Sequence, residues 1–139
     1  MADILAPDLF NRVFHMDDHG DAISEAYKLT ATPSVADKLY FGIIPAGLEV
    51  HLVRLQREAT AASVTMSLGY EPVDATKGPT ANTTYWFSAL AVNAAGGDFS
   101  LGNPVRFEHP VKLVGTVGGA GYTAKRVDVI VQGKAIGVK

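Results

Sequence analysis

From about residue 22 onward, apolar and polar residues alternate with a period of two, as they do in β-strands that bury one face. The segments predicted as strands are AISEAYKL (22–29), KLYFGII (38–44), EVHLVRLQ (49–56), VTMSLGY (64–70), TTYWFSALAV (83–92), PVRF (104–107), VKLVGTV (111–117) and RVDVIVQ (126–132). TTYWFSALAV is equally compatible with a short helix. About eight strands at short spacing, with no long helix between them, favour an antiparallel sandwich or barrel over a parallel α/β sheet.

The alternation also predicts which side chains face the core. One face of each clear strand is apolar, and the residues on these faces are Ile23, Tyr27 and Leu29, then Leu39, Phe41 and Ile43, then Val64, Met66, Leu68 and Tyr70, and finally Val127, Val129 and Val131. EVHLVRLQ is less regular, because Val50 and Leu52 share one face while Val53 and Leu55 share the other. This strand is therefore either buried on both faces or interrupted by a bulge.

The segment TVGGAGYTAK (116–125) holds three glycines, Gly118, Gly119 and Gly121. A phosphate-binding loop needs its glycines between a strand and a helix, so that helix N-terminal amides point at the anion. Here a predicted strand precedes the glycines and another follows them, and no Gly-Lys-Ser/Thr sequence occurs. We therefore predict a β-hairpin whose tip uses the positive φ angles that glycine allows.

Residues 1–20 differ from the rest of the chain, being polar and interrupted. Within PDLFNRVF, Pro7 suits the first position of a helix, and four apolar residues then fall on one helical face: Leu9, Phe10, Val13 and Phe14. Two helical turns are marginal alone in water and need a surface to lie against. We expect an N-terminal arm (1–20) that packs on its own body or on a neighbouring subunit, followed by one β-domain, a sandwich or a barrel (21–139).

The tripeptide YWF (85–87) contains the single tryptophan of the chain. In a regular strand, Tyr85 and Phe87 would share one face and Trp86 would point to the other, so at least one of the three should face away from a one-sided core. These aromatic residues either pack in the core or form a contact surface, because Trp and Tyr are enriched at the centres of interfaces. Trp86 is accordingly a candidate interface residue together with the four apolar residues of the arm.

Composition narrows the classes of function. The 139-residue chain has no cysteine, which excludes disulfides and thiolate metal sites. Its formal net charge is −2, whereas proteins that bind the phosphates of nucleic acid carry a strong excess of basic residues, so the net charge argues against nucleic-acid binding. No apolar run approaches the ~20 residues that span a bilayer, and the N-terminus lacks the pattern of a signal peptide. We expect a protein made in the cytoplasm that has neither nucleic acid nor a membrane as its partner.

The charges are unevenly distributed. Residues 1–25 contain six acids against Arg12, whereas residues 106–139 contain six bases against Glu108 and Asp128. The acidic N-terminal segment is either an ordinary solvated surface or a segment that binds a basic neighbour.

Candidate chemistry is sparse. HMDDHGD (15–21) contains metal-ligand residue types, but no glutamate follows His15 as in zinc proteases, and Asp17, Asp21 and Glu25 are four apart rather than alternating as in calcium loops. A polar linker is the favoured interpretation, with metal binding as the alternative. No serine has the Gly-x-Ser-x-Gly context of a nucleophile. We therefore expect no enzymatic activity, no catalytic or metal-binding residues and no cofactor.

Four segments together resemble a family of small virion proteins of tailed bacteriophages, described as head-decoration or capsid cement proteins. The segments are LYFGIIPAGLEV, SLGYEPVDA, TTYWFSALAVNAAGG and PVKLVGTVGGAGYTAKRVDVIVQG, and the resemblance covers roughly residues 38–133. It implies an all-β fold, an antiparallel β-sandwich of jelly-roll or immunoglobulin-like type. Members of the family often end in an aromatic-rich tail, whereas this chain ends in GKAIGVK.

The resemblance also implies a function. Such proteins sit on the outer surface of the phage head, often as homo-trimers, where they bridge neighbouring major capsid subunits and stabilise the shell. The partner would then be the major capsid protein, and no catalytic residue is implied. The alternative is a carbohydrate- or host-surface-binding β-domain of a tail or fibre, in which exposed aromatics such as Trp86 would stack on sugars.

Overall fold

The structure is a computed structural model that describes residues 2–6, 9, 22–100 and 103–137. The described residues form ten strands and no helix. The strands are β1 (Asp3–Leu5), β2 (Ala22–Ala31), β3 (Lys38–Ile44), β4 (Leu48–Arg57), β5 (Thr65–Pro72), β6 (Asn82–Ala91), β7 (Gly96–Phe99), β8 (Val105–Arg106), β9 (Val111–Gly118) and β10 (Lys125–Ala135). All eight predicted strands are present, and TTYWFSALAV is a strand rather than a helix. The short strands β1 and β7 were not predicted.

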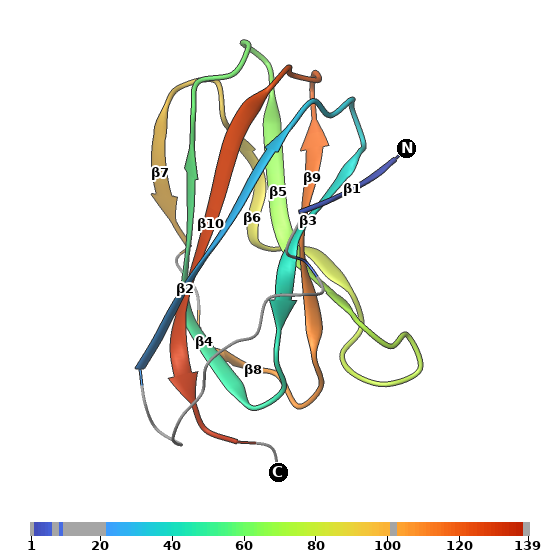
Figure 1. Ribbon diagram of the computed structural model, residues 1–139, viewed down its shortest axis with the longest axis vertical. Helices are drawn as coiled ribbons and strands as arrows, with labels where there is room; N and C mark the ends of the chain where they lie inside the picture. Colours follow the sequence, from blue (N-terminus) through green and yellow to red (C-terminus); the bar gives the residue numbers. More distant parts are fainter. Residues whose placement is uncertain (1, 7–8, 10–21, 101–102, 138–139) are drawn as a thin grey trace.

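The strands form two sheets that pack face to face (Figure 1). Sheet A has the order β1-β3-β9-β5-β6, and sheet B has the order β2-β10-β4-β7 with β8 also paired to β4. The pairs are antiparallel except for β1 with β3, which is parallel. The prediction of an antiparallel β-sandwich is therefore confirmed.

The core lies between the two sheets and is supplied by the period-two positions. Met66 and Leu68 of sheet A and Val129 and Val131 of sheet B are each 0% exposed. Burying one such side chain contributes about 1.5–3 kcal/mol relative to leaving it in water. The predicted core faces of β2, β5 and β10 are confirmed, with Ile23 and Tyr70 at their margins as partly buried contacts.

A bulge in β4 explains the irregular pattern of EVHLVRLQ. Gln132 of β10 pairs with Leu52 and Gly133 pairs with Val50, so His51 has no partner in the register. The extra residue shifts the alternation, and both Val50 and Val53 face the core, at 2% and 0% exposure. Of the two alternatives left by the sequence, the bulge is the one that the structure contains.

A second bulge, in β3, corrects one core prediction. Tyr40 pairs with Val114 and Gly42 with Leu113, so Phe41 is the extra residue. Beyond the bulge, Ile44 faces the core at 0% exposure, whereas Ile43 packs against a cluster on the outer face of sheet A. The prediction that Ile43 shares the face of Phe41 is therefore wrong, because one inserted residue reverses every later side chain.

The glycine segment turns the chain, but it does not form the predicted hairpin. The strands on either side of it, β9 and β10, belong to different sheets, so the segment carries the chain across the sandwich. Gly119 has a φ angle of +72°, and a Cβ atom there would lie 1.8 Å from the carbonyl oxygen of Ser63. A period-two pattern cannot distinguish a partner in the same sheet from one in the facing sheet, which is why the hairpin prediction was wrong.

Candidate interaction surfaces

An aromatic cluster lies where β6 forms one edge of sheet A. Its four rings are those of Tyr70, Tyr85, Trp86 and Phe107. The ring centroid of Tyr70 lies 5.5 Å from that of Tyr85, 5.9 Å from that of Trp86 and 5.0 Å from that of Phe107. Such tilted and edge-to-face contacts are favourable between aromatic rings. The cluster fixes the position of Trp86, which is partly buried against the core.

The irregular pairing of β6 overturns the predicted faces of YWF. Leu68 pairs with Phe87 and Tyr70 pairs with Asn82, so the residues between these β6 positions have no regular partners. Phe87 is 9% exposed and Tyr85 is 37% exposed, so the two do not share a face. Tyr85 is the aromatic residue that points away from the core, and a contact role for Trp86 stays a prediction.

Of the predicted arm residues, Leu9 is described, and Phe10, Val13 and Phe14 lie outside the described residues. Leu9 is 3% exposed and packs on Tyr40 and Val114, on the outer face of sheet A. The backbone of Ala6 donates a hydrogen bond to the Tyr40 carbonyl oxygen at 2.9 Å, continuing the β1–β3 pairing. Leu9 therefore covers its own chain, and contact of the arm with a neighbour stays a prediction.

A polar network borders this apolar cluster. Glu71 accepts hydrogen bonds from Lys38 Nζ at 2.5 Å and from the Tyr40 hydroxyl at 2.8 Å. Burial alone would raise the pKa of Glu71, but these two hydrogen bonds and the nearby lysines hold that pKa below its usual value. Burial and the Glu71 carboxylate raise the pKa of Tyr40. All the groups are paired, so the network joins β3 to β5 rather than offering a reactive acid.

A second carboxylate, that of the buried Asp37, holds the start of the chain. Asp37 is 7% exposed and accepts hydrogen bonds from the backbone N–H groups of Ala2 and Ser34, each at 2.8 Å. These two bonds lower the pKa of Asp37. The carboxylate thereby joins the residue before β1 to the turn that leads into β3.

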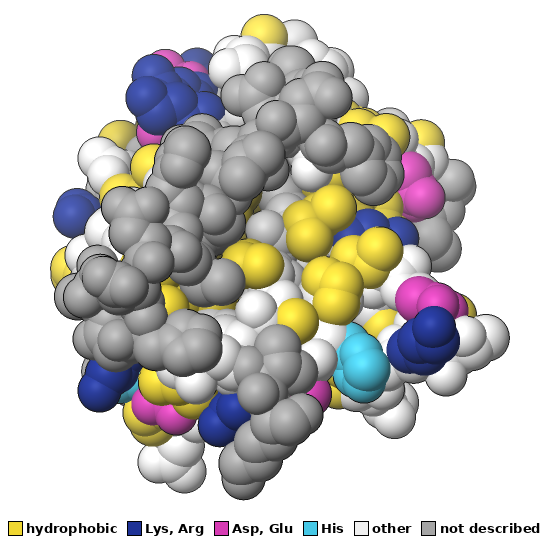
Figure 2. Space-filling model, turned by 60° about the horizontal axis from the view of Figure 1, so that its bottom comes forward, with side chains coloured by type: hydrophobic (Ala, Val, Ile, Leu, Met, Phe, Trp, Pro, Cys, Tyr) yellow, Lys and Arg dark blue, Asp and Glu magenta, His cyan; other side chains and the backbone are white. Residues whose placement is uncertain are grey.

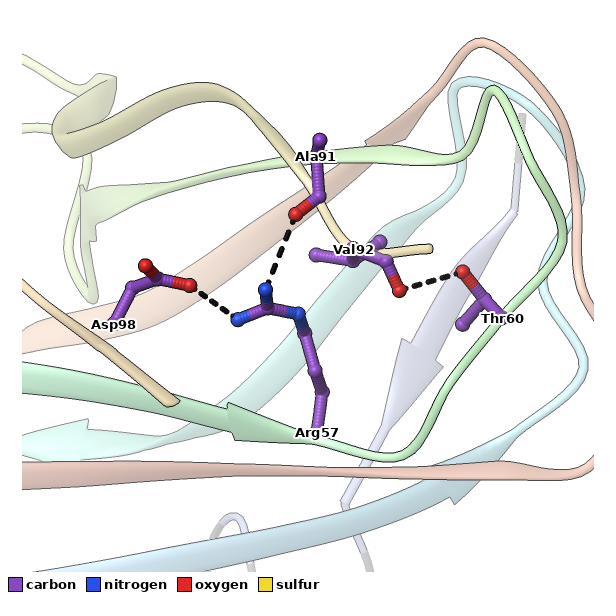
Figure 3. Close-up of polar contacts among 5 residues, drawn as sticks. All are labelled: Arg57, Thr60, Ala91, Val92 and Asp98. Carbon is purple, nitrogen blue, oxygen red and sulfur yellow. Dashed lines mark hydrogen bonds and ion pairs between the residues drawn. The ribbon is translucent and has the colours of Figure 1, made fainter. Parts of the chain in front are cut away.

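An arginine joins the two sheets at one side of the sandwich (Figure 3). Arg57, at the end of β4, donates to Asp98 of β7 at 2.5 Å and to the carbonyl oxygen of Ala91, at the end of β6, at 3.3 Å. Nearby, the Thr60 hydroxyl donates to the Val92 carbonyl oxygen at 2.8 Å. The Arg57 side chain is 9% exposed. These contacts connect an edge of sheet A to an edge of sheet B.

At the end of the sandwich that carries β8, hydrophobic side chains gather on the surface (Figure 2). One hollow among the described residues is lined by Gly78, Pro79, Arg106, Phe107, Glu108 and His109. Arg106 donates to the Gly137 carbonyl oxygen at 2.7 Å and forms an ion pair with Glu108 at 2.9 Å. The cation that lines this hollow is therefore already engaged within the chain.

The described residues contain no cluster of three or more His, Asp or Glu side chains that could hold a metal ion. The segment 15–21, which raised the question of metal binding, lies outside the described residues, and its interpretation as a linker stays a prediction. Within the part of the chain that is described, no helix has the length and apolar character needed to cross a membrane.

Comparison with known proteins adds two similar folds. No family model matches the sequence, and no curated protein matches it. A chain from the capsid of Ralstonia phage GP4 superposes with a TM-score of 0.78 over 99% of both chains, at 16% sequence identity. A chain from the capsid asymmetric unit of the cyanophage Pam1 superposes with a TM-score of 0.64 over 90% of this chain and 94% of that one, at 19% identity. The chain therefore shares its fold, nearly from end to end, with proteins found in two phage capsids.

Proposed function

We propose that the chain is a structural protein of a phage virion that sits on the outside of the head and bridges neighbouring major capsid subunits. The observation that carries this proposal is the superposition on the Ralstonia phage GP4 capsid chain over 99% of both chains. An agreement of this extent includes the loops and edge strands, which vary more freely between proteins than the core does. The sequence resemblance to head-decoration proteins supports the same role.

The mechanism that we propose is multivalent clamping without a chemical step. A standard interface buries about 800 Å² on each partner, and a symmetric trimer repeats that contact three times around one axis. Once one subunit of the trimer is bound, the others are held at a high effective concentration near their own sites. Individually weak contacts thus give tight overall binding to the shell.

The number of copies in purified particles tests this role. A head-decoration protein follows the symmetry of the shell, so we expect on the order of hundreds of copies per particle. Particles that lack the chain should also release their DNA at a lower temperature than complete particles. A number in the few dozens or fewer would instead favour the tail or fibre alternative, in which the exposed aromatic residues bind a sugar or host surface.

The arm is a further part of this proposal. We infer that Phe10, Val13 and Phe14 order against a neighbouring subunit, because they continue the apolar stripe that begins at Leu9. Deleting residues 1–20 would also remove β1 and Leu9, which pack on the chain itself. Replacing Val13 and Phe14 by serine avoids that loss, and unchanged occupancy of the variant on particles would reject the inference.

A further inference from the structure

The outer face of sheet B carries an arginine that has no acidic partner. Among the described residues, the other three arginines each form an ion pair with an acid: Arg57 with Asp98, Arg106 with Glu108, and Arg126 with Asp128. Arg54 forms no such pair in this part of the chain. Its buried Nε atom has no hydrogen-bond partner, but the same holds for Arg57 and Arg106, so the missing acidic partner is what distinguishes Arg54. A guanidinium without an acidic partner in its own chain leaves its terminal N–H groups free to bind a carboxylate from outside.

The guanidinium of Arg54 is held in place by its surroundings on β7. Arg54 is paired with Phe99 in the sheet, and its Cζ atom lies 5.1 Å from the centre of the Phe99 ring. A Cβ atom at Gly97 would lie 2.8 Å from Arg54 Nε. Because glycine has no side chain, position 97 leaves room for the guanidinium of Arg54. The Phe99 ring attracts the guanidinium through a cation–π interaction, and the planar fork of N–H donors suits a bidentate acceptor.

Apolar side chains surround this charge. Phe99 is 52% exposed, a large value for a phenylalanine. Arg54 is also paired with Ile130 of β10, and Ile130 is paired with Ala26 of β2, so one row across the sheet reads Ala26, Ile130, Arg54, Phe99. Beside this row lies a shallow hollow lined by Ile23, Ser24, His51, Leu52, Gln132 and Gly133. This part of the face therefore combines a guanidinium that has no acidic partner with apolar surface.

We propose that this row, defined by Ile130, Arg54 and Phe99, is the surface that docks on a neighbouring capsid subunit through an acidic segment of that subunit. A carboxylate of the segment forms a bidentate pair with Arg54, and an adjacent apolar side chain packs on Phe99. Charge complementarity selects this occupant, because Arg and aromatic residues form the energetic centres of interfaces when their partners complete them. The inference rests on the proposed virion role and names the chemistry of the partner surface.

Binding of the purified chain to capsids of the same phage, assembled without it, tests the inference. Arg54→Gln and Phe99→Ser should each weaken binding at least tenfold, the size of effect typical of a central interface residue. Arg54→Gln should also reduce the dependence of affinity on salt concentration. Two matched controls should bind like the wild type. Arg126→Gln removes a cation from the same face that already has an acidic partner, and Val35→Ser removes an apolar side chain that is 51% exposed.

The outcomes separate this inference from the proposed function. If the wild type binds and Arg54→Gln and Phe99→Ser bind equally well, the docking surface is wrong while the virion role stands. If the wild type fails to bind, the virion role is wrong and the inference fails with it. Melting temperatures of the variants close to that of the wild type show that a loss of binding is not a loss of folding.

Discussion

At the scale of single residues, two carboxylates hold separate parts of the chain together. Glu71 links β3 to β5 through Lys38 and Tyr40, and Asp37 holds the beginning of the chain. Asp37 is buried and Glu71 is partly buried, and each carboxylate receives two hydrogen bonds that compensate for the lost hydration. Arg54, in contrast, has no acidic partner among the described residues, and for this reason we assign it a partner outside the chain.

The lowered pKa of Asp37 predicts how stability depends on pH. A group whose pKa is lower in the folded state contributes stability above its unfolded pKa, and that stability is lost as the pH falls through the folded pKa. The wild type should therefore lose stability progressively below about pH 4, near the unfolded value for an aspartate. Asp37→Asn should be less stable at pH 7 and should lose less on acidification, because the variant has no carboxylate to protonate there. Melting temperatures from pH 7 to pH 2 measure both effects, and parallel curves would contradict this account.

At the scale of elements, the sequence predicts where strands lie better than it predicts which strands meet. The alternation of Val127, Val129 and Val131 identifies β10, because burial of one face imposes period two. The faces of Ile43 and Phe87 could not be predicted, because each follows an irregularity that one inserted or unpaired residue creates. The partners of Asp37 and Arg57 could not be predicted either, because they are brought together only by the fold. Arg54 and Phe99 lie 45 positions apart, and no local motif marks them.

The crossing between β9 and β10 depends on Gly119. Alanine at this position would need a positive φ angle and would bring its Cβ atom within 1.8 Å of a backbone oxygen. We expect Gly119→Ala to lower the free energy of unfolding by at least about 2 kcal/mol. Gly96→Ala is the matched control, because Gly96 also has a positive φ angle, +150°, but nothing lies within 4 Å of its added Cβ atom. Denaturant unfolding compares the two variants, and an equal loss in both would show that the close approach does not matter.

At the scale of the whole molecule, the two sheets are held by the apolar core and by a few polar contacts at their margins. Arg57 spans from β4 to both β7 and the end of β6, and so joins the edges of the two sheets (Figure 3). A clamp must transmit force between its contacts, so a connection of this kind suits a protein that bridges capsid subunits.

Replacing Arg57 by methionine should reveal the strength of this connection. The side chain of Arg57 is 9% exposed and that of Asp98 is 41% exposed, so we expect a loss of about 1–3 kcal/mol, less than for a fully buried pair. Arg126→Met is the control, because Arg126 is 48% exposed and solvent screens its pair with Asp128, so the loss of stability should be smaller than for Arg57→Met. Equal stability changes in denaturant unfolding would show that Arg57 is an ordinary surface arginine.

The central claim is that this sandwich works as a bridge on the outside of a phage head. A reconstruction of the intact particle tests it most directly. We expect density for the sandwich on the outer surface at every equivalent symmetric position, in contact with at least two neighbouring capsid subunits, with the outer face of sheet B against one of them. Density confined to the tail, or a particle without this chain, would contradict the account.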